Sequence, residues 1–304
     1  RVRIIIFERE NMHASAISLE LPVEDPATPN QESHTGSHSF DWLHSIMHER
    51  ASRQSFEPGS ALLHFEIIRP LGQGSFANVY LAQNLLTCSL HALKVFTGKD
   101  AEEICEAEYK VLKQMTHPNI VSATRMYVHP VPFIVQEYFT PTTLSSYAFG
   151  GETMSLWQFL TALKQTLEAV SWLHDEEQRW IHRDIKPANI LFDGEQARLI
   201  DFNVACRVQA EEPFSGSPDY VPPEVCGRLG GTPAADVYAL GKTFSKVLQR
   251  AVTSPPKQLG ELQMVDDLLQ GFLLEDAKLR PTAGEGLAVL LDIMGLLEPL
   301  AETC

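Results

Sequence analysis

The sequence predicts an α+β fold, with strand-like runs early in the domain and helical patterns later in the chain. Strand-like runs at 65–71 and 91–96 flank a glycine-containing turn in the first part. In the second part, apolar residues at 155–174 recur with the 3.6-residue period of a helix, and 287–297 forms a further apolar helix. Strands followed by helices in this order are typical of the α+β class.

Composition limits the classes of protein that remain. The 304 residues are 44% hydrophobic, enough for a sizeable core, and carry a formal net charge of −15. That charge argues against nucleic acid as a partner, and it favours basic partners or simply solubility. No apolar run approaches the roughly 20 residues that cross a bilayer, so we expect no membrane span. Five scattered cysteines without metal-ligand spacing favour reduced thiols and an intracellular location, in cytoplasm or nucleus: Cys88, Cys105, Cys206, Cys226 and Cys304.

Residues 1–60 are expected to form an N-terminal extension that is largely a linker. The stretch 18–39 is rich in Pro, Ser, Thr, Glu and His, a composition that does not support a core. Apolar residues at helical spacing within 40–54 predict a short amphipathic helix, packed either on the main domain or on a partner. Four histidines without acidic or cysteine partners indicate a solvated polar face rather than a metal site: His34, His38, His44 and His48.

The stretch 182–203 carries the groups with the clearest chemistry. It reads HRDIKPANILFD at 182–193 and, after a connector expected to be a hairpin, LIDFN at 199–203. Phosphoryl transfer needs a carboxylate to orient and deprotonate the acceptor hydroxyl, a cation near the phosphate, and oxygen ligands for Mg²⁺. The alternative is a loop of solvated charges between two strands, and it does not account for so many of these groups within one stretch.

This stretch resembles the catalytic loop and metal-binding turn of eukaryotic-type protein kinases. The resemblance implies a Ser/Thr kinase that uses ATP and Mg²⁺, because Lys186 is the form seen in Ser/Thr kinases. It assigns Asp184 and Lys186 as catalytic residues and Asn189 and Asp201 as metal ligands.

The same resemblance covers about 64–297 and implies a bilobal fold. The expected N-lobe, 64–136, is β-rich with one key helix. The expected hinge is 137–143, and the mainly helical C-lobe is 144–297.

The turn LGQGSFANVYLA (71–82) is expected to hold phosphates through its backbone amides. Val79 begins the returning strand and can cover a flat base. The third glycine of the family pattern is Ala77 here, for which we expect weaker or slower nucleotide binding. The residues of this turn expected to bind the cofactor are Leu71, Gly72, Gly74, Ser75 and Val79.

The strand at 91–96 places Ala92 and Lys94 on one face, where Ala92 is small enough to admit an adenine ring. On a helix through 101–115, Glu108 is the only acid within the predicted apolar stripe. We expect it to pair with Lys94, since an unpaired buried carboxylate is costly; a solvated Glu at the edge of the stripe is the alternative. The predicted stripe consists of Ile104, Ala107, Val111 and Met115.

By resemblance, the run FIVQEYF (133–139) enters the hinge that holds the adenine edge. Gln136 then occupies the gatekeeper position, and Glu137 and Phe139 belong to the adenine-binding hinge. Leu191 matches the residue that packs beneath the adenine. The following 140–143 offers no obvious carboxylate for the ribose, and that contact stays unassigned.

Several residues after Asp201 are expected to support the site. Asn203 stands where the family usually has Gly; because Asn tolerates positive φ, we expect the metal-binding turn to survive but to switch less readily. By resemblance, the Ser217 hydroxyl bridges Asp184 and Lys186. The same comparison pairs Glu224 with Arg280 and makes Asp236 hold the backbone of the catalytic loop.

Arg183 is a cation expected to face an anion in the activation segment. Phosphorylated Ser215 and the acidic pair Glu211–Glu212 are the two candidates. We expect an upstream kinase or autophosphorylation at Ser215 or Ser217. Ala188 lies at the position where many basophilic members of the family carry Glu. The chain therefore lacks this Glu as a group to recognise Arg in a substrate.

The predicted function is transfer of the γ-phosphate of ATP to protein serine or threonine hydroxyls. The alternative is a pseudokinase or scaffold that binds nucleotide weakly, with the changes at Ala77 and Asn203 as its sign. A small-molecule kinase on the same fold is disfavoured by GSPDYVPPE (216–224) and Arg183.

Overall fold

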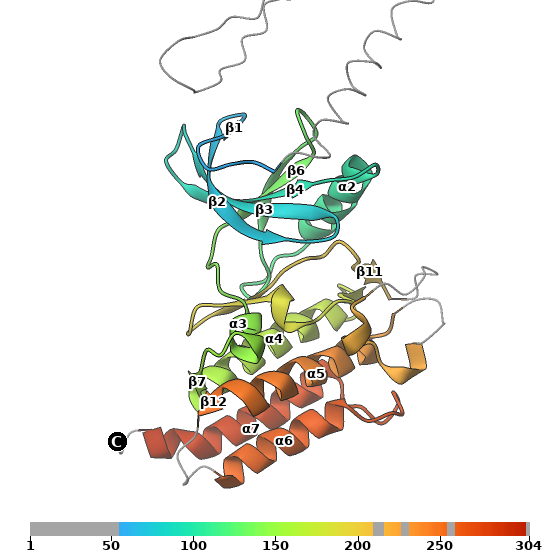
Figure 1. Cartoon of the computed structure of the whole chain (residues 1–304). Coiled ribbons are helices and arrows are strands. Elements are labelled where there is room, and N and C mark those ends of the chain that lie inside the picture. Colours follow the sequence, from blue (N-terminus) through green and yellow to red (C-terminus); the bar gives the residue numbers. More distant parts are fainter. Residues whose placement is uncertain (1–54, 209–215, 226–230, 254–258, 302–304) are drawn as a thin grey trace, which may run out of the picture. The chain divides into compact units, whose positions relative to one another are not determined.

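The computed structural model describes residues 55–208, 216–225, 231–253 and 259–301, so most of the N-terminal extension lies outside it. The first part of the described chain is a six-stranded antiparallel sheet with the order β1-β2-β3-β4-β6-β5 (Figure 1). Helix α2 (Ala101–Leu112) packs against β4, β5 and β6. The strands are β1 (Ala61–Leu62), β2 (Phe65–Gln73), β3 (Ala77–Asn84), β4 (Leu90–Phe96), β5 (Ala123–Tyr127) and β6 (Phe133–Glu137).

The strands predicted at 65–71 and 91–96 are confirmed as parts of β2 and β4. The register pairs Val79 with Lys94, and Ala92 with both Leu81 and Gln136, so these side chains share one face of the sheet. The returning strand begins at Ala77, two residues earlier than predicted. The opposite face holds a separate apolar cluster: Leu62, Phe65, Ile67, Tyr80, Ala82, Leu93, Val95, Val131, Phe133 and Val135.

The helix predicted at 101–115 forms, but it ends at Leu112 and buries a different face. The predicted apolar stripe is confirmed only in part: Met115 is buried and Ile104 and Val111 pack against the core half-buried, but Ala107 is exposed. Packing on the sheet turns the small Ala101 and Cys105 inward and brings Glu108 with them. The buried face is therefore set by the fit to the sheet and by the charge of Glu108, which hydrophobicity alone does not weigh. The buried residues are Ala101, Cys105, Glu108 and Leu112.

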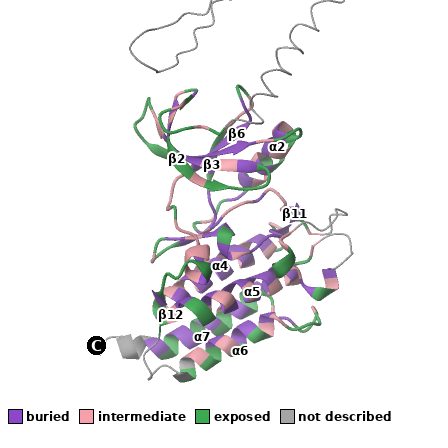
Figure 2. Ribbon diagram, viewed as in Figure 1, coloured by how far each residue is buried: buried purple, intermediate pink, exposed green. Residues whose placement is uncertain are grey.

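The second part of the chain is mainly helical. Helix α4 contacts α5 and α7, and α5 contacts α6 (Figure 1). Figure 2 shows buried residues concentrated along α4 and α5, where the core of this part lies. The helices are α3 (Leu144–Phe149), α4 (Leu156–His174), α5 (Pro233–Ala251), α6 (Leu259–Phe272) and α7 (Ala283–Ala301).

Helix α4 confirms the helix predicted at 155–174. Its first turn is closed by a capping box, in which the Ser155 side chain accepts from Gln158 N–H and the Gln158 side chain accepts from Ser155 N–H. The predicted helix at 287–297 lies within α7, which extends beyond it at both ends. The apolar residues predicted for α4 are all buried: Leu156, Phe159, Leu160, Leu163, Leu167, Val170 and Leu173.

Short elements lie between α4 and α5, with one more just before α4 and one just after α5. The predicted hairpin is confirmed as β9 (Ile190–Phe192) and β10 (Ala197–Leu199). No helix in the described ranges is long and apolar enough to cross a membrane. The other short elements are β7 (Met154–Ser155), β8 (Trp180–Ile181), β11 (Cys206–Arg207), β12 (Val252–Thr253), η1 (Pro187–Asn189), η2 (Pro218–Tyr220) and η3 (Pro223–Val225).

Candidate active site

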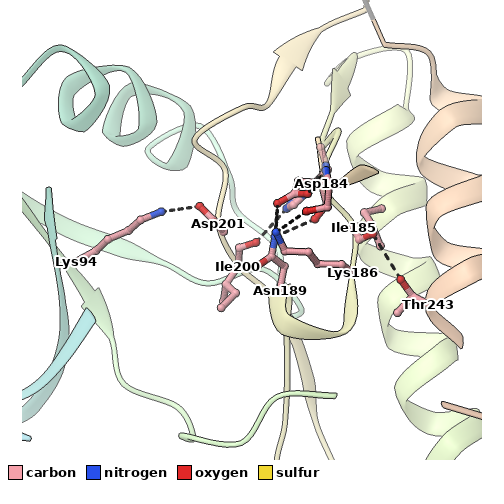
Figure 3. Close-up of polar contacts among 10 residues, drawn as sticks. Lys94, Asp184, Ile185, Lys186, Asn189, Ile200, Asp201 and Thr243 are labelled. Carbon is pink, nitrogen blue, oxygen red and sulfur yellow. Dashed lines mark hydrogen bonds and ion pairs between the residues drawn. The ribbon is translucent and has the colours of Figure 1, made fainter. Parts of the chain in front are cut away.

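Three predicted site residues meet in the loop between β8 and β9. The Lys186 Nζ lies 2.6 Å from Asp184 Oδ2, and Asn189 Nδ2 donates to Asp184 Oδ2 at 2.9 Å and to its backbone carbonyl at 2.8 Å (Figure 3). Asn189 lies in η1, where Pro187 at the first position fixes the turn. Both Asp184 and Asn189 are buried, so their geometry is set by these bonds rather than by solvent.

Ser217 joins this cluster from the distant turn before η2. Its hydroxyl lies 2.8 Å from Lys186 Nζ, as predicted. The contact to Asp184 differs from the prediction, because it is the Ser217 backbone N–H that donates to Asp184 Oδ1, at 3.0 Å. The carboxylate therefore accepts from three sources, which fixes its orientation.

Lys94 links the sheet to the segment after β10. Its Nζ lies 2.7 Å from the Glu108 carboxylate on α2, so the predicted ion pair is confirmed. The same Nζ lies 2.7 Å from Asp201 Oδ1, and Figure 3 shows the two groups pointing toward each other. An ammonium has three N–H donors, and these two carboxylates use two of them.

The pKa directions at this triad follow from burial and charge. Burial alone would lower the pKa of Lys94, but the charges of Glu108 and Asp201 outweigh it and raise that pKa. Burial would raise the pKa of Asp201, whereas Lys94 lowers it below the usual value. Burial raises the pKa of Glu108, and the like charge of Asp201 adds to this against the attraction of Lys94. Lys94 therefore stays charged at neutral pH, and Asp201 is ionised.

Asp236 on α5 holds the backbone of the expected catalytic loop, as predicted. Its carboxylate accepts from the backbone N–H groups of His182 and Arg183, each at 2.8 Å, and lies 3.0 Å from His174 Nε2. Burial would raise the pKa of Asp236, but these hydrogen bonds and the two histidines lower it overall. Arg183 has φ +67°, a conformation that a residue with a side chain adopts only when its surroundings hold it.

The tolerance of Asn203 for positive φ, which was expected to let the turn survive, is not used in the structure. The left-handed residue of this turn is Asp201, with φ +68°, and Asn203 is not among the residues with positive φ. Asn203 therefore places no backbone strain on the turn in this conformation. Positive φ suits Asp201 comparatively well, because Asp is one of the residues that tolerate it.

The glycine turn lies between β2 and β3. Gly74 N–H donates to the Ala77 carbonyl at 2.8 Å, which closes the turn. Leu71 is half-buried, and Gly72, Gly74 and Ser75 are exposed. Ala77 is buried as the first residue of β3, so its methyl group belongs to the core rather than to the turn.

The expected hinge contains a contact that the sequence did not reveal. Arg198 on β10 forms an ion pair with Glu137 and stacks over the Phe139 ring, with its guanidinium carbon 4.4 Å from the ring centroid. Glu137 also accepts from Ser122 N–H at 2.8 Å. The only local sign was a charged residue within a short hairpin strand, which is ordinary, so no pattern pointed to Arg198.

Two further expectations concern the segment after the turn. Arg280 donates to both oxygens of Glu224, at 2.5 and 2.8 Å, so their predicted pairing is confirmed. The candidates proposed to face Arg183, namely Ser215 and Glu211–Glu212, lie outside the described residues. Leu191 forms a β-bridge with Thr143, which places it beside the expected hinge.

The fold and this cluster define the class of protein. Residues 65–288 match the protein kinase domain family, and the chain belongs to that family. The crystal structure of the PF14_0431 kinase domain superposes with a TM-score of 0.65 at 18% identity, covering 78% of this chain and 97% of that one, so the two share a fold.

Relatives of known class agree with this assignment. Human serine/threonine-protein kinase 10 is 30% identical over 235 residues, covering 70% of this chain and 23% of that protein. Human mitogen-activated protein kinase kinase kinase kinase 3 is 31% identical over 203 residues, covering 63% of this chain and 22% of that protein. Myosin light chain kinase A of Dictyostelium discoideum is 29% identical over 189 residues, covering 58% of this chain and 63% of that protein. The chain thus spans less than a quarter of the length of the two human relatives.

Proposed function

We propose that the protein is a Ser/Thr kinase that transfers the γ-phosphate of ATP to serine or threonine hydroxyls of proteins. The observation that carries this proposal is the cluster of Asp184, Lys186 and Ser217. A buried carboxylate and a cation lie 2.6 Å apart, and a hydroxyl from the expected substrate-docking turn touches the cation. This arrangement suits an acceptor hydroxyl that enters beside Asp184.

The side chains present fit Mg²⁺ and a triphosphate. Both side-chain hydrogen bonds of Asn189 use Nδ2, which leaves Oδ1 without a bond to the described residues and suited to a hard cation. Asp201 is held by Lys94 through Oδ1 alone, and its side chain is 29% exposed. Asn189 and Asp201 would hold Mg²⁺, and bound Mg²⁺ would offset the negative charge of the phosphates.

Each of the chain's own groups then has a separate task. Asp184 would orient the acceptor hydroxyl and take its proton at a carboxylate oxygen. Lys186, 2.8 Å from Ser217, would place a positive charge where charge builds up on the transferred group. Lys94, fixed by Glu108, would direct its remaining N–H toward the α- and β-phosphates.

The adenine would lie between the shared face of the sheet and the expected hinge. The glycines fit a close approach of the phosphates, because a Cβ at Gly72 would meet no atom within 4 Å and one at Gly74 only the Ala77 carbonyl at 3.4 Å. The protein's own packing therefore does not require glycine there, and approach of a ligand gives a reason for it. The residues proposed to contact the nucleotide are Leu71, Gly72, Gly74, Ser75, Val79, Ala92, Lys94, Glu137, Phe139 and Leu191, with Glu108 positioning Lys94.

The pseudokinase alternative loses part of its motivation. Ala77 is accommodated in the core and Asn203 carries no positive φ, so neither change distorts the site. We also propose an intracellular location, which fits the free thiols of Cys88 and Cys105. Phosphorylation of Ser217 would place a dianion beside Asp184, so activation by phosphate is better suited to Ser215.

The test is phosphoamino-acid analysis after incubation with γ-labelled ATP, Mg²⁺ and a mixture of unrelated proteins. We expect label on phosphoserine and phosphothreonine, with none on phosphotyrosine, and its loss in Asp184→Asn. Label confined to small molecules, or to phosphotyrosine, would overturn the proposal.

A further inference from the structure

A group of basic and aromatic side chains lies beside the proposed acceptor site. We call it the basic–aromatic surface, and it consists of Phe149, Tyr220, Lys246 and Arg250. Phe149 belongs to α3, Tyr220 to η2, and the two cations to α5. Helix α5 contacts both α3 and η2, so residues distant in the sequence meet here (Figure 1).

The two cations share one aromatic ring. Lys246 Nζ lies 4.3 Å from the Tyr220 ring centroid, donates to its hydroxyl at 3.2 Å, and lies 5.8 Å from the Phe149 centroid. The Arg250 guanidinium lies 5.5 Å from the same Phe149 ring, which is 55% exposed. Lys246 and Arg250 are four residues apart on α5, so they lie on one face of the helix.

The described residues offset the positive charge of this surface only weakly. The nearest carboxylate, that of Asp219, lies 3.9 Å from Lys246 Nζ and is 81% exposed. Such a pair contributes little, because water screens it. Arg250 has no carboxylate partner within the described ranges, and its NH1 donates to the Ala148 carbonyl instead.

A purely structural role, in which the cations only stack on the rings, is the simpler alternative. It does not explain why two like charges gather around one exposed ring in a chain with a net charge of −15. Repulsion between Lys246 and Arg250 is relieved if an anion binds between or beside them. The charge pattern therefore indicates an anionic partner.

The surface lies where the flanking residues of a substrate would pass. Tyr220 ends the turn that begins after Ser217, and Ser217 contacts both Asp184 and Lys186. Helix α3 also contacts η1, where the exposed Ala188 offers no negative charge. A substrate whose hydroxyl reaches Asp184 would thus meet two cations on this side, with the exposed Asp219 as the one acid that an ion pair places beside them among the described residues.

We propose that the basic–aromatic surface recognises acidic side chains, so that the preferred substrates are protein segments with Asp or Glu flanking the acceptor Ser or Thr. This inference rests on the proposed function and adds the class of substrate to it. A phosphoserine in the substrate offers the same anionic chemistry as a carboxylate, and the experiment separates the two sources.

The experiment measures kcat and KM for four peptides that share one acceptor serine and differ only in their flanking residues: Glu, phosphoserine, Gln or Arg. We expect the Glu peptide to have the lowest KM, and we expect Lys246→Glu and Arg250→Glu to raise that KM about fivefold each with little change in kcat. Because the interaction is exposed, the preference should also weaken as salt is added. A lower KM for phosphoserine than for Glu would show priming by phosphate instead of recognition of carboxylates, which overturns the proposal.

The matched control is Lys99→Glu, an equal change of charge at an exposed residue before α2. We expect Lys99→Glu to leave all four KM values unchanged. Equal KM values for the Glu, Gln and Arg peptides would overturn the acidic preference while leaving the kinase proposal intact. If no peptide is phosphorylated, the affinity of the labelled Glu peptide is measured by fluorescence anisotropy instead. A lower affinity in Lys246→Glu and Arg250→Glu would support recognition of acidic residues by the basic–aromatic surface, and an unchanged affinity would overturn it.

Discussion

The ammonium of Lys94 lies 2.7 Å from the carboxylate of Asp201, although 107 residues separate the two in the chain. This contact ties β4 of the sheet to the turn after β10 of the helical part. The same ammonium is paired with Glu108 on α2, so one cation joins three segments. Because all three groups are charged and largely buried, the position of each depends on the other two.

Replacing Lys94 by Met should remove activity and lower stability for different reasons. Loss of the cation from the proposed phosphate site should slow transfer by roughly 100-fold or more. The buried Glu108 would also lose its partner, which should lower the free energy of unfolding by about 3 kcal/mol. Phosphate transfer and urea unfolding measure the two effects.

The double variant Lys94→Met/Glu108→Gln separates these effects. It should recover part of the lost stability, because the fully buried charge of Glu108 is removed together with its partner, although Asp201 still lacks its lysine, while activity stays low. Lys99→Met controls for loss of a lysine at an exposed position. A double variant no more stable than Lys94→Met alone would contradict the account of the pair.

The lowered pKa values of Asp201 and Asp236 predict loss of stability in acid. Both pKa values lie below the ordinary value of 3.8 in the folded chain. The stabilising contribution of each is therefore fully present above pH 3.8, and it is lost as the pH falls through the lower folded value. Urea unfolding at intervals from pH 6 to pH 2.5 should show this decline.

Asp236→Asn tests the second of these contributions. The variant should be less stable than the parent at pH 6. The difference between them should shrink as the pH falls below 3.8, because Asp236 of the unfolded parent binds a proton there before Asp236 of the folded parent does. Asp292→Asn on the exposed side of α7 is the control and should follow the parent. A difference that stays constant with pH would argue against an ionised Asp236.

Cys105 should resist alkylation in the folded protein. Burial, with the negative charges of Glu108 and Glu106 adding to it, raises the pKa of the Cys105 thiol to about 12, so the reactive thiolate is scarce at pH 8. Cys88 is exposed and should react first with iodoacetamide. Mass spectrometry of peptides sampled over time measures both rates, and equal rates for Cys88 and Cys105 before unfolding would refute this prediction.

The substitution Asn203→Gly tests how freely the turn after Asp201 moves. Glycine opens backbone conformations that Asn reaches less easily, so the turn should switch more readily between states. We expect faster hydrogen exchange of the backbone around 201–205, with little change in melting temperature. Unchanged exchange together with unchanged activity would mean that position 203 does not control the turn.

Much of the fold could be predicted because local patterns and tertiary packing agree. The seven apolar residues of α4 recur with a helical period and all are buried. Helix α2 shows where this agreement fails, since its buried face includes Cys105 and the charged Glu108 in place of Ile104 and Ala107. A helical wheel weighted by hydrophobicity does not favour a face that carries a carboxylate, even when a lysine on the neighbouring sheet can pair with it.

In the site, too, some contacts could be predicted from the sequence and others could not. The pairing of Lys94 with Glu108 could be predicted because each charge was expected in a buried place and needed a partner, whereas the pairing of Glu224 with Arg280 followed from the family resemblance. The contact between Arg198 and Glu137 could not, because nothing in the sequence says that a hairpin strand passes the expected hinge. Likewise, the positive φ of Asp201 depends on the whole turn and not on the preference of Asn203 alone.

The most direct test of the central claim compares the parent chain with Asp184→Asn in two assays, ATP binding and phosphate transfer to protein. We predict similar ATP affinities and a transfer rate at least about 100-fold lower in the variant, because loss of the proton acceptor affects the reaction rather than the binding. Equal transfer rates, or ATP binding by the parent without any transfer, would contradict the account.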